Sequence, residues 1–208
     1  MTRVATTGRR VLLAAGPALL LARVARAAAD PDAVAPIAGL NAALLASMKA
    51  GKSSSFPQRF NALLPAVDRA FDLQAILQAA VGLKWASLPP ARQAELLAVF
   101  RQFTAASYAS KFDSFSGEKL DVLPDSRTID ADQVVETRLT PASGDPVRLD
   151  YVMRRTPAGW KAVDVLLTGT ISQVAVQRSD FRSLVGEDGS GLLASLRKKV
   201  SDLSGGTL

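Results

Sequence analysis

The hydrophobic pattern of this chain changes its period near Lys119, and this change constrains the fold more than any other feature. Before Lys119, apolar residues recur at the spacing of amphipathic helices. After it they alternate with polar residues, as in 135–139 and 147–154, which is the period of half-buried strands. The C-terminal part returns to a helical pattern. Helices followed by strands and further helix predict an α+β domain.

Four helices are expected in the first half of the chain. Gly51 and Gly82 are suited to end two of them, and Asp72 is a suitable N-cap. Pro65 is expected to bend or interrupt the second helix. The last of the four has a wide apolar, aromatic-rich face, which another layer must cover. The expected helices span residues 37–50, 57–70, 72–81 and 91–112.

The sheet is expected to be an antiparallel meander of about four strands, because short turns separate the alternating runs. In the strand 160–167, Val163, Val165 and Leu167 are expected to face away from Trp160 and Ala162, so that both sides are covered. Residues 171–176 are expected to continue as strand, followed by helices near 179–185 and 190–203. A curved sheet closed by helices encloses a cone-like cavity, a common place for a ligand.

The first 29 residues are typical of a signal peptide. A basic start is followed by an apolar run, 11–22, and by small residues that fit an A-x-A cleavage site ending at Ala27 or Ala29. The apolar run is shorter than the roughly 20 residues that span a bilayer. The pair Arg9-Arg10 also resembles a twin-arginine export signal, although it could belong to an ordinary basic start. We therefore expect export to the periplasm and a single domain over residues 30–208.

Charge and composition exclude several classes of function. The chain has 25 Lys and Arg against 19 Asp and Glu, but five of the arginines lie in residues 1–29. The remainder is therefore close to neutral and lacks the basic surface of a nucleic-acid-binding protein. There is no cysteine and no histidine, which removes His-based catalytic triads and ordinary zinc sites. No metal or other cofactor is expected.

Two groups of residues resemble the MlaC or toluene-tolerance family, with the related HpnM branch as a close variant. The resemblance covers roughly residues 37–203. One departure is Gln177, where the family usually has an aromatic residue before the arginine. The first group is Phe71-Asp72, Val81-Gly82-Leu83-Lys84-Trp85, Arg92, Phe100 and Tyr108-Ala109-Ser110; the second is Trp160 to Val165 with Gly169, Ser172, Arg178, Phe181, Leu184, Gly189, Leu192 and Leu196.

The resemblance implies a periplasmic phospholipid carrier with an NTF2-like fold, closed by N- and C-terminal helices around an apolar cavity. It also implies two partners, an inner-membrane MCE-type ABC transporter and an outer-membrane MlaA-like lipoprotein complex. The cargo would be phospholipid or a related membrane lipid such as a hopanoid, and the protein is expected to be a monomer without nucleic-acid partners. The expected lipid-contacting residues are Leu73, Ile76, Leu77, Phe100, Phe103, Tyr108, Phe112, Tyr151, Met153, Val163, Val165 and Leu167.

Apolar character alone does not distinguish a lined cavity from a filled core, so two other functions stay open. An enzyme on the same fold could use Asp164 and Asp150, since an apolar pocket raises the pKa of a carboxyl group. A scaffold protein of the envelope would have a filled core and no lipid. Asp164 also fits a structural role, with a partner at the edge of the sheet. Arg148, Asp150 and Arg154 are expected on one strand face, which is either solvated or placed around a pocket mouth near a lipid headgroup.

Overall fold

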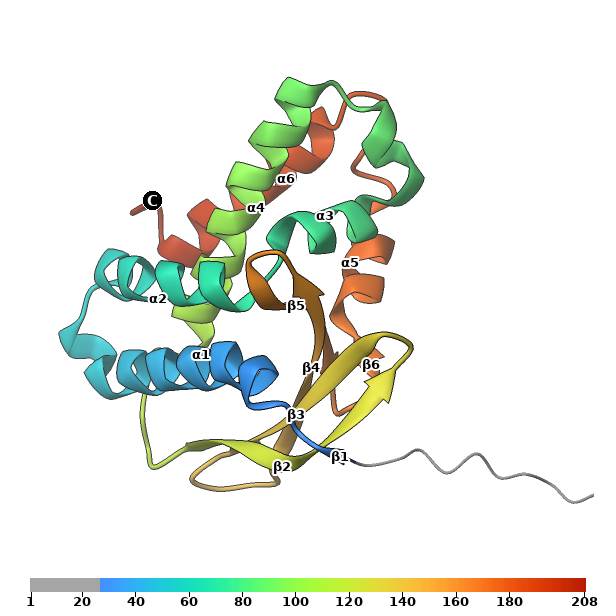
Figure 1. The fold of residues 1–208 in the computed structure, drawn as a ribbon. Coiled ribbons are helices and arrows are strands. Elements are labelled where there is room, and N and C mark those ends of the chain that lie inside the picture. The colour runs from blue at the N-terminus through green and yellow to red at the C-terminus, as the bar shows by residue number, and fades with distance from the viewer. Residues whose placement is uncertain (1–26) are drawn as a thin grey trace, which may run out of the picture.

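The computed structural model describes residues 27–208, so the predicted signal peptide lies almost wholly outside the described residues. Six α-helices and two short 3-10 helices accompany one sheet in the described part (Figure 1). The helices are α1 (Pro31–Ala50), η1 (Gly51–Ser53), α2 (Phe56–Ala70), α3 (Leu73–Val81), η2 (Gly82–Ser87), α4 (Pro90–Lys111), α5 (Gln173–Phe181) and α6 (Ser190–Ser204). The strands are β1 (Ala27–Ala28), β2 (Lys119–Ile129), β3 (Asp132–Thr140), β4 (Val147–Thr156), β5 (Gly159–Leu167) and β6 (Ile171–Ser172).

The N-terminal helices begin where side chains satisfy their free backbone N–H groups. Asp72 accepts from the backbone N–H of Ala75 at 2.9 Å, which confirms it as the N-cap of α3. Ser55 and Gln58 form a capping box at the start of α2. Helix α2 runs through Pro65, so the interruption that the sequence allowed there does not occur. Helix α1 begins six residues earlier than expected and therefore contains Pro36. A long helix tolerates this proline because it removes only one backbone hydrogen-bond donor.

The expected strand 171–176 is wrong beyond its first two residues. Ile171 and Ser172 pair with β5 as β6, and α5 then begins at Gln173. Ser172 caps the new helix by accepting from the Ala175 N–H, and the Asp164 carboxylate holds this start, because it accepts hydrogen bonds from the Ser172 hydroxyl and from the backbone N–H of Val174. The helix expected near 179–185 is accordingly earlier in the chain and ends at Phe181.

The sheet is a meander in which every strand pairs antiparallel with its neighbour in sequence, in the order β1 to β6. This confirms the α+β class and the antiparallel topology. The register shifts between β4 and β5, so that Tyr151 pairs with Val165 but Met153 pairs with Ala162. Such a bulge moves one residue out of step. Ala162 therefore lies on the same face as Val165, and the expected opposition of these residues is wrong.

Helices cover one face of the curved sheet in two layers. Helix α1 packs on β2, β3 and β5, α2 and α3 pack on β5, and α4 packs against α2 and α3 (Figure 1). Helix α6 then packs along α4. The segment Pro31–Ser53 is long and apolar enough to cross a membrane, with a mean hydropathy of 1.4. In this fold it supplies core residues instead, among them Ile37, Leu40 and Leu44.

The other face of the sheet carries a buried cluster of ion pairs. The Glu136 and Asp150 side chains, from paired positions on β3 and β4, are 1% and 0% exposed. Arg127 lies 3.0 Å from Glu136 and 2.8 Å from Asp150, and it also donates to the Gly169 carbonyl at 3.0 Å. Arg148 lies 2.8 Å from each carboxylate, and its hydrogen bonds to Asp150 raise its pKa. The sequence predicted that Asp150 lies on a solvated face, and this prediction is wrong. Asp150 is buried, and two arginines neutralise its charge.

Removing Arg127 is expected to destabilise the fold strongly, because two buried carboxylates would keep a single cation between them. We expect Arg127→Ala to lower the free energy of unfolding by about 3–5 kcal/mol, measured by urea denaturation. Arg154→Ala is the matched control, since Arg154 pairs with Asp132 and is itself 54% exposed. The control should cost less than about 1 kcal/mol. Equal losses in the two variants would contradict a special role for the buried cluster.

Candidate functional site

A chain of aromatic rings crosses the space between the helices and the sheet. The rings of Phe112 and Tyr108, both at the end of α4, lie 5.9 Å apart. Phe71 follows at 5.9 Å from Tyr108 and contacts Tyr151 of β4 at 6.1 Å. Phe71 is fixed against the sheet because Asp72 donates its backbone N–H to the Ala162 carbonyl of β5. This chain of rings links α4, the start of α3 and the centre of the sheet.

Most of the predicted lipid-contacting residues lie in or beside the apolar core. Ten of the twelve belong to one continuous cluster or pack against it, Val163 and Leu167 being the exceptions. Seven are buried and five are half-buried. The buried ones are Leu73, Ile76, Leu77, Phe100, Tyr151, Met153 and Val163; the half-buried ones are Phe103, Tyr108, Phe112, Val165 and Leu167.

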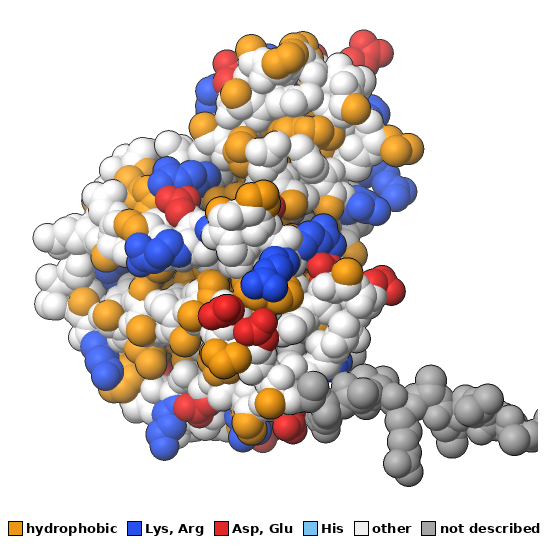
Figure 2. Space-filling view, in the orientation of Figure 1, with side chains coloured by type: hydrophobic (Ala, Val, Ile, Leu, Met, Phe, Trp, Pro, Cys, Tyr) orange, Lys and Arg blue, Asp and Glu red, His pale blue; other side chains and the backbone are white. Residues whose placement is uncertain are grey.

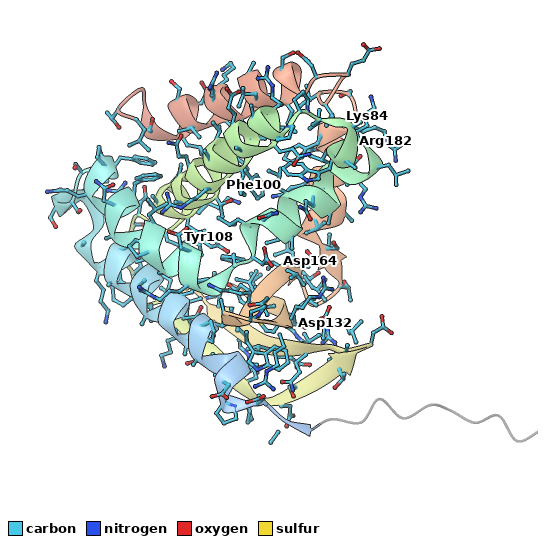
Figure 3. The ribbon with its side chains drawn as sticks, turned by 45° about the horizontal axis from the view of Figure 1, so that its top comes forward. Lys84, Phe100, Tyr108, Asp132, Asp164 and Arg182 are labelled. Atoms are coloured by element: carbon cyan, nitrogen blue, oxygen red, sulfur yellow. The ribbon has the colours of Figure 1, made fainter. Side chains whose placement is uncertain are left out.

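Phe100 and Phe103 belong to a second group of rings within the same core. Phe100 contacts Phe181 of α5 edge-on at 6.4 Å, and Phe103 lies 6.3 Å from Phe100. Lys199 of α6 lies over the Phe103 ring at 5.6 Å. Figure 3 labels Phe100 and Tyr108 at separate positions along α4. The predicted residues therefore fall into a group against the sheet and a group within the helical layer.

Two tyrosine hydroxyls place polar but uncharged groups inside the ring chain. Burial raises the pKa of Tyr151 to about 12, although interaction with the Tyr108 hydroxyl offsets part of the rise. Burial also raises the pKa of Tyr108 well above its ordinary value, and the neighbouring Tyr151 raises it further. Both hydroxyls stay neutral at physiological pH, so they can donate and accept hydrogen bonds without placing charge in the core.

Asn41 introduces a buried amide that has no partner among the described residues. Its side chain is 4% exposed, and neither the amide nitrogen nor the amide oxygen makes a hydrogen bond. It shares a face of α1 with Ile37 and Leu44, both of which belong to the apolar core. An unpaired buried polar group of this kind costs about 1–3 kcal/mol. Such a cost is unusual in a core that serves packing alone.

The two carboxylates considered for catalysis are both occupied by structural partners. Asp164 accepts from the Val165 and Val174 backbone N–H groups at 2.7 and 3.1 Å and from the Ser172 hydroxyl. Asp150 is held by Arg127 and Arg148 on the opposite face of the sheet from Tyr151. No group of three or more potential metal ligands occurs in residues 27–208. The apolar core therefore contains no carboxylate set up for acid–base chemistry.

Among the hollows on the surface of the described residues are two that no predicted lipid-contacting residue lines. The larger, about 520 Å³, lies between α1, α2 and the β4–β5 turn. The smaller, about 440 Å³, is polar and includes Glu136, Arg138 and Arg148 beside the ion-pair cluster. The fold and site thus define an α+β protein with an aromatic-rich apolar core between its helices and its sheet.

The sequence profile of the MlaC protein family matches residues 39–198, and the chain therefore belongs to the MlaC family. Members of this family are periplasmic lipid-binding carriers and not enzymes. No curated protein matches the chain.

A solved structure is similar over most of the chain. It is the phospholipid-binding protein from Ralstonia solanacearum, determined in complex with a phospholipid at 1.53 Å resolution. The two chains share 22% identity with a TM-score of 0.71, over 83% of this chain and 99% of the other. At this identity the likeness shows a shared fold, which confirms the predicted class.

Two residues outside the predicted set stand out in the core. Phe71 joins the rings of α4 to those of the sheet, yet it was noted only as part of the family resemblance. Its position just before the Asp72 cap was a usable signal, because an apolar residue there often packs onto the helix that follows. Asn41 had no comparable signal, since the sequence does not show whether an amide within an Ala- and Leu-rich helix is buried or exposed.

Replacing Asn41 with leucine is expected to stabilise the protein in the absence of lipid. Leucine has a similar size but no polar atoms, so the unpaired amide is removed. The free energy of unfolding of the delipidated protein, measured by thermal denaturation, should rise by about 1 kcal/mol. Asn61→Leu, at an exposed position of α2, is the matched control and should change stability little. A loss of stability in Asn41→Leu would contradict the assignment of an unsatisfied amide.

Proposed function

We propose that this protein is a periplasmic carrier that holds a phospholipid, or a related membrane lipid such as a hopanoid, in its apolar core. It passes the lipid between the inner and outer membranes, and its partners are an MCE-type ABC transporter and an MlaA-like lipoprotein complex. The observation that carries the proposal is the fold shared with the Ralstonia solanacearum protein, which was solved with a phospholipid bound. The family and the lack of an available catalytic carboxylate support it.

The energetics of lipid transfer fit a core of this composition. Removing one acyl chain of about 16 carbons from a bilayer exposes surface at a cost on the order of 12 kcal/mol. A carrier must recover nearly all of this free energy, but a much tighter grip would prevent release. The ring chain offers a large apolar surface, and its two hydroxyls carry no charge at physiological pH. The unpaired amide of Asn41 adds a polar group that a lipid ester could satisfy.

Acyl chains reach this core only if the helical layer moves away from the sheet, because the rings fill the space between them. Ring contacts of about 6 Å between Phe71 and its two tyrosine neighbours would have to separate. The bulges in β2–β3 and β4–β5 bend the strands next to these rings. In this proposal the lipid replaces the contacts between helices and sheet.

Export completes the proposal, with the signal peptide removed and residues 30–208 forming a single carrier domain. Cleavage after Ala29 would also remove β1, whose residues Ala27 and Ala28 pair with Ser126 and Asp125 of β2. The sheet of the mature carrier would then begin at β2.

A carboxylate placed within the core should prevent lipid retention. Val165 pairs with Tyr151 and packs against the core, so Val165→Asp would put an unpaired charge against acyl chains, at a cost of several kcal/mol. We expect native mass spectrometry of the wild-type protein, purified from the periplasm, to reveal bound species of lipid mass. Val165→Asp should be exported equally but carry no lipid.

Val176→Asp is the matched control, because Val176 is 43% exposed on α5, and it should retain the wild-type complement of lipid. Val163→Asp is also expected to lose lipid, although the bulge places Val163 out of step with Val165. Unchanged retention in Val165→Asp would contradict the assignment of the core as the binding site. A wild-type protein that stays lipid-free after incubation with vesicles would favour a scaffold function.

A further inference from the structure

The larger surface hollow is a groove bounded by three elements. It lies between the first half of α1, the end of α2 and the β4–β5 turn, and its volume is about 520 Å³. Its lining includes Leu40, Ala66, Arg69, Arg155 and Trp160. Neither the family assignment nor the predicted lining gives this groove a role.

The floor of the groove is the outer boundary of the apolar core. Leu40, Ala66 and Trp160 line the groove and also belong to the continuous core cluster that includes Phe71 and Tyr151. A molecule whose apolar part entered the core at this point would leave its polar part in the groove.

The rim of the groove is cationic. Arg69, Arg155 and Lys161 line it against a single acidic residue, Asp32. Lys161 already donates to the backbone carbonyls of Asp68 and Arg69 at 2.8 and 2.9 Å. Figure 2 shows cationic side chains gathered over the end of α2 and the β4–β5 turn.

Within the part of the chain that the structure describes, Arg69 and Arg155 form no salt bridge. The charged residue that precedes each of them does form one: Asp68 pairs with Arg101, and Arg154 pairs with Asp132. Two guanidinium groups are thus left available on the rim of one groove. Guanidinium groups bind phosphate oxygens in a two-pronged geometry, which makes them the usual partners of phosphate groups.

Trp160 provides a second, independent observation at the same place. The residue is 8% exposed, and its indole N–H has no acceptor among the described residues. The Arg155 guanidinium lies over this ring, 5.6 Å from its centroid. A buried donor without an acceptor is costly unless a ligand supplies one.

We propose that this groove binds the phosphodiester headgroup of the lipid whose acyl chains occupy the core, with Arg69 and Arg155 contacting the phosphate oxygens. The inference rests on the proposed carrier function and adds a polar site to it. Free phosphate monoesters share the same chemistry, so the test must separate a lipid headgroup from a soluble phosphate.

The test uses the periplasmic protein expressed from the full sequence, with Trp85→Phe so that Trp160 is the single tryptophan. Fluorescence titrations compare three probes: dihexanoyl phosphatidylglycerol, dihexanoylglycerol without a phosphate, and glycerol 3-phosphate. The variant is Arg69→Gln/Arg155→Gln. The matched control is Arg182→Gln/Arg197→Gln. Arg182 follows α5 (labelled in Figure 3) and Arg197 lies on α6; both are exposed and form no salt bridge among the described residues.

We expect the double variant to bind dihexanoyl phosphatidylglycerol at least about tenfold more weakly than the control, because two charge-assisted contacts are lost. Dihexanoylglycerol should bind all three proteins equally. Equal phosphatidylglycerol affinities would overturn the headgroup site and leave the carrier function standing. Glycerol 3-phosphate binding as tightly as the lipid would also overturn it, in favour of a soluble-phosphate site. Failure of the wild-type protein to bind either lipid would overturn both proposals.

Discussion

Covering the apolar face of one curved antiparallel sheet is the constraint on which the rest of this structure depends. A sheet with one apolar face must bury it against another layer, and here α1 to α4 provide that layer. The contact is made largely by rings, with Phe71 placed between Tyr108 and Tyr151. In the proposed function the same surface would contact acyl chains, so stability and lipid binding would depend on the same residues.

The two faces of the sheet have different tasks. Opposite the rings, Arg127 and Arg148 hold two buried carboxylates. Arg127 also donates to the Gly169 carbonyl, which fixes the turn that leads to β6. The Asp164 carboxylate then fixes the start of α5. These polar contacts keep the strands and the turn in place without using the apolar face. A sheet fixed from behind could remain intact while the helices move away from its front.

The class of fold was predictable from the sequence, because hydrophobic period and turn residues report directly on helices, strands and their order. The β4–β5 bulge was not predictable, since an alternating pattern does not show where one residue is inserted. The buried position of Asp150 was missed for a related reason: a charged residue on a strand normally indicates solvent. Its partner Arg148 is two positions away, but its second partner Arg127 lies 23 positions away. The pattern of one strand does not show that a distant arginine completes the cluster.

Ten of the twelve predicted lipid-contacting residues lie in the core cluster or pack against it, and their contact with lipid stays a prediction. Sequence alone could not separate the rings against the sheet from those against α5. It also could not show that Asn41 is buried or that Arg69 and Arg155 meet at one groove. Each of these depends on how distant elements pack, whereas composition and spacing report on one element at a time.

The central claim, that lipid enters the space now filled by the ring chain, is tested most directly by photocrosslinking at Phe71. A photoreactive benzoylphenylalanine at this position, in protein exported and irradiated in the periplasm, should form an adduct of phospholipid mass, because Phe71 lies at the centre of the chain. The same group at the exposed Phe115 serves as the reference. Lipid adducts at Phe115 but none at Phe71, in protein that carries lipid, would contradict the account.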